Sequence, residues 1–426
     1  MTKERANARS PKSNAFYGWR VVGGAFILAV FSWGLGFYGP PIYLQAVHEA
    51  RGWSLGLSSA AISTHFLLGA AVVANLPRIY RRFGIANVVK AGSICLAIGV
   101  LGWSLAREPW QLFAATLFSG AGWAATGPAT INAVIAPWFV RKRSAALSSA
   151  YNGASIGGVV FSPLWAVSIE YLGFPAASAL IGATTILTIW ILAELVFRTS
   201  PKEMGLSPDG PDVRPVVELP PTPSTRQLTG SKLWHDLRFA SLAAGMALGL
   251  FAQIGLLSQI FSLLTPSLGA QLAGIAAGIA TAAAIAGRTL VGWLMPVNAD
   301  RRLVASFSYL VQIAGATAFI ISGGNAYLLI AGIILFGFGI GNATSLPPLI
   351  AQAEFAGADV PRVVPLIVAI SQAAYAFAPA TFGVIRQFAG GNEAVGGNNP
   401  ALFATAALFQ AAAIGMFLIG RSRRPQ

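Results

Sequence analysis

Apolar residues in this chain form long continuous runs separated by short polar segments, and the runs do not alternate apolar with polar positions. A helix needs about 20 apolar residues to cross a bilayer, whereas barrel strands would alternate at about ten-residue spacing. The pattern therefore predicts an all-α membrane protein with twelve transmembrane helices. The expected spans are residues 18–47, 53–76, 86–105, 110–137, 144–169, 174–197, 238–264, 269–295, 303–322, 326–351, 362–386 and 400–420.

Composition supports this class and excludes others. Of 426 residues, 55% are apolar and only 10% are charged, whereas soluble domains carry about a quarter charged residues. The 28 basic residues outnumber the 14 acidic ones, but they lie in short separate blocks, unlike the single basic face of a nucleic-acid-binding protein. We therefore expect membrane lipid around the chain and no nucleic-acid partner. With one cysteine, Cys95, neither a disulfide framework nor a Cys-based metal site can form.

The basic blocks indicate orientation. With twelve spans, 24 of the 28 Lys and Arg residues lie on one side of the membrane, Arg51, Arg107 and Arg386 on the other, and Arg288 inside the eighth span. Cytoplasmic loops are enriched in Lys and Arg. The pattern therefore predicts that both termini are cytoplasmic, and adding or removing one span would destroy the asymmetry.

One long hydrophilic stretch, residues 198–237, is rich in proline and charge, which predicts a cytoplasmic linker. It separates residues 1–197 from residues 238–426, which we expect to be two six-helix bundles. The halves share residues at an offset of 218 positions, which indicates a parallel duplication. The matches are Gly69, Val73, Leu76, Leu117, Phe118, Ala125 and Thr126 with Gly287, Val291, Leu294, Leu335, Phe336, Ala343 and Thr344.

Four stretches carry a resemblance to a known family: "FYGWRVV" at 16–22, "WFVRKRSAALSSAYNGASIGG" at 138–158, "RTSPKEMGLSPDG" at 198–210 and "GRTLVGW" at 287–293. With them the chain resembles the major facilitator superfamily, and within it the bacterial monocarboxylate transporter and oxalate/formate antiporter branch. The resemblance implies two six-helix pseudo-repeat bundles in the bacterial inner membrane, and a substrate-binding arginine at Arg288.

The chain also departs from the family pattern. Pro77 and Pro296 stand in the loops where the superfamily places residues of its interdomain charge latch. Ile42 and Ala277 occupy the positions of the lysine and the acidic residue of animal monocarboxylate transporters. The resemblance therefore carries neither the charge latch nor the proton relay over to this chain.

Arg288 is the strongest candidate for substrate binding. A charged residue inside a span costs about 2.5 to 3.5 kcal/mol on insertion scales, so it is retained for function by default. A planar guanidinium binds a carboxylate through two parallel hydrogen bonds. The alternative is that its long side chain reaches the cytoplasmic interface or packs under the interdomain loop.

His65 lies centrally in the second span, where it could exchange a proton, donate to a substrate oxygen, or form an interhelical hydrogen bond without a transport role. Glu49, Glu170 and Glu194 lie at span ends, and we expect them to be interfacial. Without a carboxylate at mid-span, proton coupling would have to use His65 or the substrate itself.

Uncharged polar residues at mid-span depth complete the candidate site. Each is more often a contact between helices than a ligand contact. We favour Tyr38, Gln372 and Tyr375, because the resemblance places spans 1 and 11 beside the substrate cavity. Asn342, Gln253 and Asn132 are the remaining candidates.

The sequence thus predicts a monomeric secondary transporter that moves a small organic anion, a monocarboxylate, by alternating access and without a cofactor, metal or catalytic site. Two alternatives stay open: a carrier that exports a neutral or drug-like solute, and a transport-inactive membrane sensor. A membrane enzyme is disfavoured because no His, Asp and Glu cluster is visible in the sequence.

Overall fold

The computed structural model describes residues 16–210, 230–296, 298–389 and 399–421. Within these ranges the chain is helical and contains no strand, which confirms the predicted all-α class. The elements are α1 (Tyr17–Gly36), α2 (Gly39–Arg51), α3 (Leu55–Phe83), α4 (Ile85–Leu105), α5 (Pro109–Thr126), α6 (Pro128–Ile135), α7 (Arg143–Leu172), α8 (Phe174–Leu192), the π-helical turn η1 (Ala193–Phe197), the 3-10 turn η2 (Gly230–Leu233), α9 (Leu237–Leu294), α10 (Arg301–Ile321), α11 (Ala326–Ile340), α12 (Asn342–Glu354), α13 (Val360–Tyr375), α14 (Ala378–Ala389) and α15 (Pro400–Ile419).

Ten helical stretches of the described chain are long and apolar enough to cross a membrane. Each coincides with one of the twelve expected spans. The other two expected spans correspond to the pair α5 and α6, and to the apolar stretch Gly278–Leu294 within α9. These lengths and compositions suit an integral membrane protein.

Four expected spans are built from two consecutive helices with a break between them, which the apolar pattern did not predict. The pairs are α1–α2, α5–α6, α11–α12 and α13–α14. Proline contributes to some of the breaks because it lacks an N–H donor and disfavours a helical residue before it. Gly127, for example, is extended directly before Pro128. Each break leaves main-chain carbonyl oxygens that need other hydrogen-bond donors, because lipid offers none.

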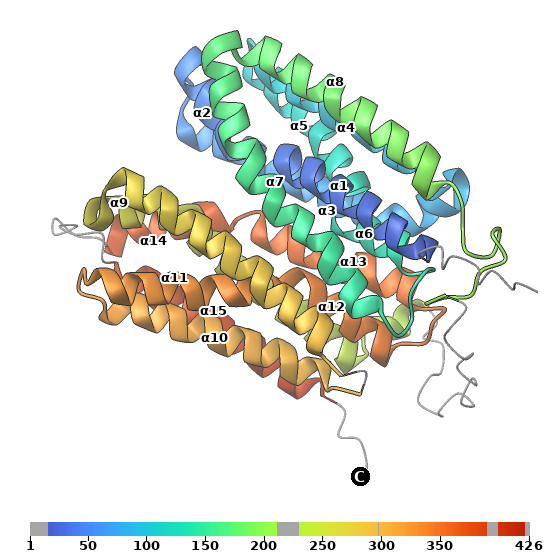
Figure 1. Cartoon of the computed structure of the whole chain (residues 1–426). Coiled ribbons are helices and arrows are strands. Elements are labelled where there is room, and N and C mark those ends of the chain that lie inside the picture. Colours follow the sequence, from blue (N-terminus) through green and yellow to red (C-terminus); the bar gives the residue numbers. More distant parts are fainter. Residues whose placement is uncertain (1–15, 211–229, 297, 390–398, 422–426) are drawn as a thin grey trace, which may run out of the picture.

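Helix α9 contains 58 residues and would be about 87 Å long if it were straight. Yet Arg302, soon after its end, donates from Nη2 to the carbonyl oxygen of Arg238 at its start, over 2.9 Å. The helical path must therefore turn back on itself, and Figure 1 shows this reversal at the left end of α9. Its two arms correspond to the expected spans 238–264 and 269–295.

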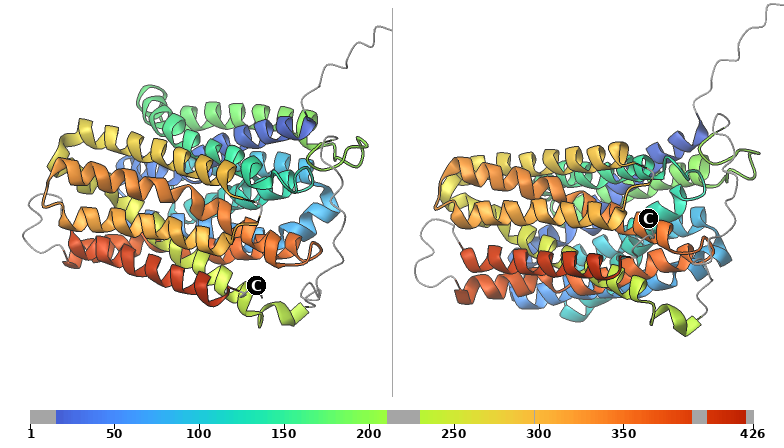
Figure 2. Two further views of the ribbon diagram at one scale, coloured as in Figure 1. Left: turned by 60° about the horizontal axis from the view of Figure 1, so that its bottom comes forward. Right: turned by 90° about the horizontal axis from the view of Figure 1, so that it is seen from below.

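The helices lie in two groups (Figure 1). The N-terminal group, α1 to α8, lies above the C-terminal group, α9 to α15, and the long helices of both groups run in similar directions (Figure 2). The main contacts between the groups join α3 to α13 and α7 to α9. The groups contain the same helices as the predicted halves, but their origin by duplication and their behaviour as separate bundles stay predictions.

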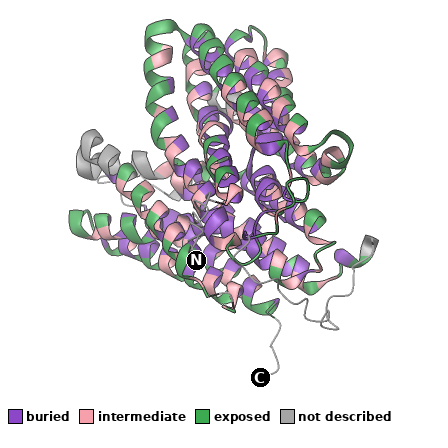
Figure 3. Cartoon of the chain, turned by 45° about the vertical axis from the view of Figure 1, so that its right-hand side comes forward, coloured by how far each residue is buried: buried purple, intermediate pink, exposed green. Residues whose placement is uncertain are grey.

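Residues on the outward faces of the helices are exposed, and residues between the helices are buried (Figure 3). Many exposed side chains are large and apolar, such as Leu180, Leu187 and Ile191 on α8 and Phe307 and Leu310 on α10. A soluble protein rarely exposes so much apolar surface in continuous patches. Lipid is the solvent that suits these faces.

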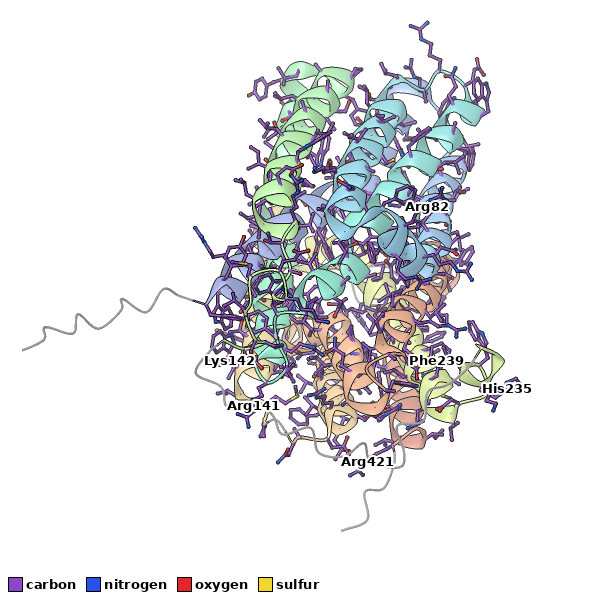
Figure 4. All side chains as sticks on the ribbon, turned by 90° about the vertical axis from the view of Figure 1, so that its right-hand side faces the viewer. Arg82, Arg141, Lys142, His235, Phe239 and Arg421 are labelled. Carbon is purple, nitrogen blue, oxygen red and sulfur yellow. The ribbon has the colours of Figure 1, made fainter. Side chains whose placement is uncertain are left out.

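One end of the bundle carries basic side chains from both groups. Figure 4 looks onto this end, where Arg82, Arg141, Lys142, His235 and Arg421 are labelled. The first and last described residues lie at this end. Trp19, near the start of α1, stacks on Trp293 near the end of α9, and Arg421, the last described residue, pairs with Asp300 directly before α10. The side of the membrane that this end faces stays a prediction.

Part of the expected linker, 198–237, is packed. Pro201 and Asp209 are buried, and Leu206 contacts the apolar core. Residues 211–229 lie outside the described ranges. The first part of the linker therefore belongs structurally to the N-terminal group.

Candidate functional site

Arg288 lies on the second arm of α9, where this helix meets α7. Its side chain is 4% exposed. Nε donates to the carbonyl oxygen of Gly341 at 2.7 Å, and Nη1 donates to the carbonyl oxygen of Tyr151 at 2.6 Å. Nη1 also lies 3.3 Å from Asn152 Oδ1 and 3.4 Å from Ser155 Oγ. The guanidinium thus joins the two helix groups inside the protein and does not extend to the membrane surface.

All of these acceptors are neutral. None of the ion pairs formed by the described residues includes Arg288. Hydrogen bonds satisfy N–H donors but leave the positive charge in place, and a buried charge without a counter-charge is costly. The contact between α7 and α9 therefore holds an uncompensated cation that favours an anion beside it.

Glycine allows the helices around Arg288 to approach closely. A Cβ atom on Gly287 would lie 2.1 Å from the carbonyl oxygen of Phe338 on α11. A Cβ atom on Gly341 would lie 2.8 Å from Cβ of Arg288. Small residues of this kind permit tight packing of membrane helices, and here they bring the Gly341 carbonyl, at the break between α11 and α12, within reach of the guanidinium.

Tyr38 also belongs to this region. It lies at the break between α1 and α2. Its ring packs over Gly158 of α7, where a Cβ atom would lie 2.7 Å from two ring carbons. Tyr38 therefore packs on the helix whose residues Tyr151, Asn152 and Ser155 contact Arg288.

Asn132 holds Tyr151 in place. Its Nδ2 donates to the Tyr151 hydroxyl at 2.6 Å and to the carbonyl oxygen of Pro128 at 3.0 Å. The same hydroxyl lies 2.9 Å from the Pro128 carbonyl, to which it donates. Since the main-chain carbonyl of Tyr151 binds Arg288, Asn132 acts on the site through Tyr151.

Gln372 and Tyr375 of α13 form a second contact between the groups. Gln372 Nε2 donates to the carbonyl oxygen of Phe66 at 2.9 Å, and Trp123 Nε1 donates to Gln372 Oε1 at 3.2 Å. The ring of Tyr375 packs edge-on against the rings of Phe37 and Phe66. These two predicted residues therefore join α13 to α3, to α5 and to the break between α1 and α2.

His65 is fully buried within the N-terminal group. Nε2 lies 3.0 Å from the carbonyl oxygen of Gly36, and Nδ1 lies 2.8 Å from Ser119 Oγ. A carbonyl only accepts, so Nε2 carries the hydrogen. The Ser119 hydroxyl accepts from Trp103 Nε1 at 3.3 Å and can donate to Nδ1. Through these two bonds His65 on α3 links the end of α1 to α5.

Gln253 and Asn342 lie inside the C-terminal group. Gln253 Nε2 lies 3.4 Å from the carbonyl oxygen of Ile340. The side-chain amide of Asn342 lines a narrow gap with Tyr309 of α10 and Phe417 of α15. Both Asn342 amide atoms and the Tyr309 hydroxyl are buried without a hydrogen bond to the described residues. The structure brings neither predicted residue into contact with Arg288.

Several predicted residues share one kind of partner, a main-chain carbonyl near a helix break. Sequence reasoning selected them as polar residues in apolar runs, and the structure gives a physical reason for them. They satisfy oxygens that the breaks leave without helical donors. The pairs are His65 with Gly36, Gln253 with Ile340 and Arg288 with Gly341. Asn132 instead binds the Pro128 carbonyl within its own helix, α6.

Three contact residues were missed by sequence reasoning. Trp123 binds Gln372, Ser155 lies beside Arg288, and Thr289 accepts a hydrogen bond from Asn152 at 2.8 Å. Serine and threonine hydroxyls usually bond within their own helix, so no sequence pattern singled out Ser155 or Thr289. Trp123 carries no pattern that separates it from a core tryptophan.

The three candidate carboxylates lie away from Arg288. Glu194 pairs with Lys90 and with Arg198 at the end of α8. Glu49 accepts from Gln45 on the exposed side of α2, and Glu170 is exposed near the end of α7. Their positions at helix ends are those expected from the sequence.

The sequence matches the profile of the Major Facilitator Superfamily over residues 105–383, more than half of the chain. The chain belongs to the major facilitator superfamily. This confirms the resemblance at the level of the superfamily. Members of this superfamily are transporters, and the chain is accordingly a membrane protein of a transporter family.

Three curated proteins are similar in sequence to this chain. "MFS-type transporter 1" of Ophiocordyceps sp. is 26% identical over 349 residues, 79% of this chain and 72% of that protein. "Monocarboxylate transporter 13" of Bos taurus is 31% identical over 106 residues, 25% of each chain. "Fujikurins efflux protein" of Gibberella fujikuroi is 30% identical over 146 residues, 33% of this chain and 30% of that protein.

Proposed function

We propose that this superfamily member is a secondary transporter that carries a small organic monoanion, a monocarboxylate, and binds its carboxylate at Arg288. The observation that supports this proposal is the buried guanidinium whose described partners are all neutral. A single negative charge would neutralise it, whereas a dianion would leave one charge uncompensated in a low-dielectric environment.

Substrate binding in this proposal changes the contact between the helix groups. A carboxylate bound across Nη1 and Nη2 competes with the Tyr151 carbonyl for Nη1. The bond between α9 and α7 is then replaced by a bond between α9 and the substrate. The two six-helix halves can rock about this site, which is the alternating-access cycle expected for repeat-built transporters.

We further propose that the end shown in Figure 4 faces the cytoplasm of a bacterial cell, in its inner membrane. The support is the basic asymmetry of the sequence together with the basic side chains at this end. Both termini would then be cytoplasmic. Coupling to protons would use the substrate, because the candidate carboxylates lie away from Arg288 and His65 is committed to two hydrogen bonds.

A second candidate is export of a larger neutral or drug-like compound, which the name of the efflux relative favours. In that case Arg288 would serve only to join α7 to α9. The two candidates differ in substrate charge, so they can be separated by transport assays without knowing the physiological substrate.

Uptake of labelled mono- and dicarboxylates and of neutral solutes into proteoliposomes tests this function. Arg288→Ala should weaken monocarboxylate affinity by about 30-fold to several thousand-fold, because losing a desolvated charge pair costs about 2 to 5 kcal/mol. Arg288→Lys should recover part of the affinity, since an ammonium restores charge without the planar fork. Arg82→Ala, at an exposed arginine, is the control. Wild-type affinity in Arg288→Ala, or preference of the wild type for neutral solutes, would refute the anion assignment.

A further inference from the structure

Asp209, in the packed first part of the linker, makes an unusual set of contacts. Its carboxylate accepts hydrogen bonds from the main-chain N–H groups of Val140, Arg141 and Lys142, at 3.1, 2.8 and 3.1 Å. Its own N–H donates to the carbonyl oxygen of Trp138 at 2.9 Å. The residue is 6% exposed. A single linker residue therefore binds the whole turn between α6 and α7.

The three N–H groups need such a partner. Helix α7 begins at Arg143, so residues 140–142 precede it and their N–H groups are not paired within a helix. Consecutive main-chain N–H groups that converge in a turn form a binding site for an anion, and the N-terminus of a helix adds a partial positive charge. Asp209 supplies the anion from within the chain.

The backbone of Asp209 is held in a costly conformation. Its φ angle is +66°, and it is the one non-glycine residue with positive φ in the described chain. Asp tolerates this conformation better than most residues, yet it still costs free energy, so surrounding contacts must maintain it. The contacts with residues 138–142 are the ones present, which indicates that the docked position is specific.

The turn bound by Asp209 leads to the contact between the helix groups by two routes. Along α7, Ser148 meets Gly292 of α9, and Tyr151 binds Arg288. Through aromatic rings, Phe139 in the turn packs against Trp19, whose ring stacks on Trp293 of α9 with centroids 5.7 Å apart. A shift of the turn would move both sets of contacts.

We propose that Asp209 is a positioning residue for transport. Its carboxylate fixes the turn 138–142, and the turn sets where α7 and Trp19 meet α9. Residues 198–210 then move with the N-terminal group. This proposal is independent of the substrate, so it can fail while the anion assignment holds, and the reverse.

Amide hydrogen exchange of the purified full chain is the first test. In the wild type, the amides of residues 140–142 should be protected although they lie outside a helix, and free exchange there would overturn the proposal. In Asp209→Asn, the asparagine tolerates positive φ and keeps one acceptor oxygen. It lacks the negative charge, however, and its NH2 group faces the N–H donors of residues 140–142. It should speed exchange at these amides about tenfold or more. Glu203→Gln is the control, because Glu203 is exposed and accepts from Ser200 within its own turn.

Distances between the groups form the second test. In a Cys95→Ser background, spin labels at Arg82→Cys and Leu294→Cys report separation of the groups at the end shown in Figure 4. Adding Asp209→Asn should increase the population with longer distances several-fold, and adding Glu203→Gln should leave the distribution unchanged. Unchanged distances in Asp209→Asn would overturn the positioning role even if exchange increased. An equal effect of Glu203→Gln would show that the Asp209 carboxylate is not responsible.

Discussion

Gly292 provides a direct test of the contact between α7 and α9, because it has no room for a side chain. A Cβ atom there would lie 2.3 Å from Cβ of Ser148 and 2.0 Å from its hydroxyl oxygen. Gly278 on the same helix has no heavy atom within 4 Å of such a Cβ. Gly292→Ala and Gly278→Ala therefore add the same atom to one helix, with and without a clash.

The clash sets the size of the effect. Carbon atoms prefer a separation of about 3.5 to 4.0 Å, so α7 and α9 must move apart by more than about 1 Å at this level. Overpacking typically costs about 1 to 3 kcal/mol, which corresponds to a shift of about 5-fold to 150-fold in an equilibrium between two arrangements. Tyr151 lies about one turn further along α7, and its 2.6 Å bond with Arg288 would break with this movement.

Spin-label distances and thermal unfolding together measure this effect. Gly292→Ala should shift the Arg82→Cys to Leu294→Cys distribution to longer distances while the unfolding temperature changes little, because the groups can separate without unfolding. Gly120→Ala should instead lower the unfolding temperature, since its Cβ would lie 2.3 Å from the His65 carbonyl within the N-terminal group. If Gly292→Ala and Gly278→Ala gave the same distances, the reasoning about this contact would be wrong.

Three further predictions concern stability and orientation. His65→Ala should lower the unfolding free energy by about 1 to 3 kcal/mol, because two interhelical hydrogen bonds are lost, whereas Thr64→Ala, whose hydroxyl bonds within its own helix, should have little effect in a denaturation series. Burial raises the pKa of Asp300, but hydrogen bonds from Arg421 and from main-chain N–H groups outweigh it and hold the pKa below its usual 3.8. The pair with Arg421 thus adds stability that is fully present above about pH 4 and is lost progressively as pH falls below 3.8. Asp300→Asn, which keeps a capping side chain, should therefore cost under about 1 kcal/mol at pH 7 and less at pH 3. An equal cost at both pH values would contradict this. Tags at both termini and within 198–237 should be protected from an impermeant reagent applied outside cells, and labelling of any of them would refute the cytoplasmic orientation.

The sequence predicted the helical class and the approximate positions of the membrane-crossing segments, because burial in lipid demands long apolar runs. It did not predict the breaks inside four of them. Apolar periodicity reports which residues avoid water, and both helices of a broken span avoid it equally. The Gly39-Pro40 and Gly127-Pro128 pairs were visible signals of two breaks. Gly341 has no neighbouring proline and gave no comparable signal.

The candidate site was predictable in its residue types and less so in its contacts. Arg288 stood out as a cation in an apolar run, and its cost inside a membrane made it the strongest candidate. Its bond to the Tyr151 carbonyl could not be foreseen, since a main-chain acceptor has no sequence signature. The same holds for Gln372, whose partner is the carbonyl of Phe66. Asp209 was hidden for another reason, because a proline-rich, charged segment resembles a solvated linker.

The carbonyl acceptors at the helix breaks imply an uneven tolerance to mutation. A main-chain oxygen remains present whatever side chain its residue carries, so this hydrogen bond does not itself require a particular side chain at an acceptor position such as Ile340. The donors opposite them, His65, Gln253 and Arg288, have no such freedom, because their hydrogen bonds come from the side chain. For the hydrogen bonds themselves, the identity of the side chain therefore matters only on the donor side of each pair, whereas packing limits Gly36 and Gly341 on the acceptor side.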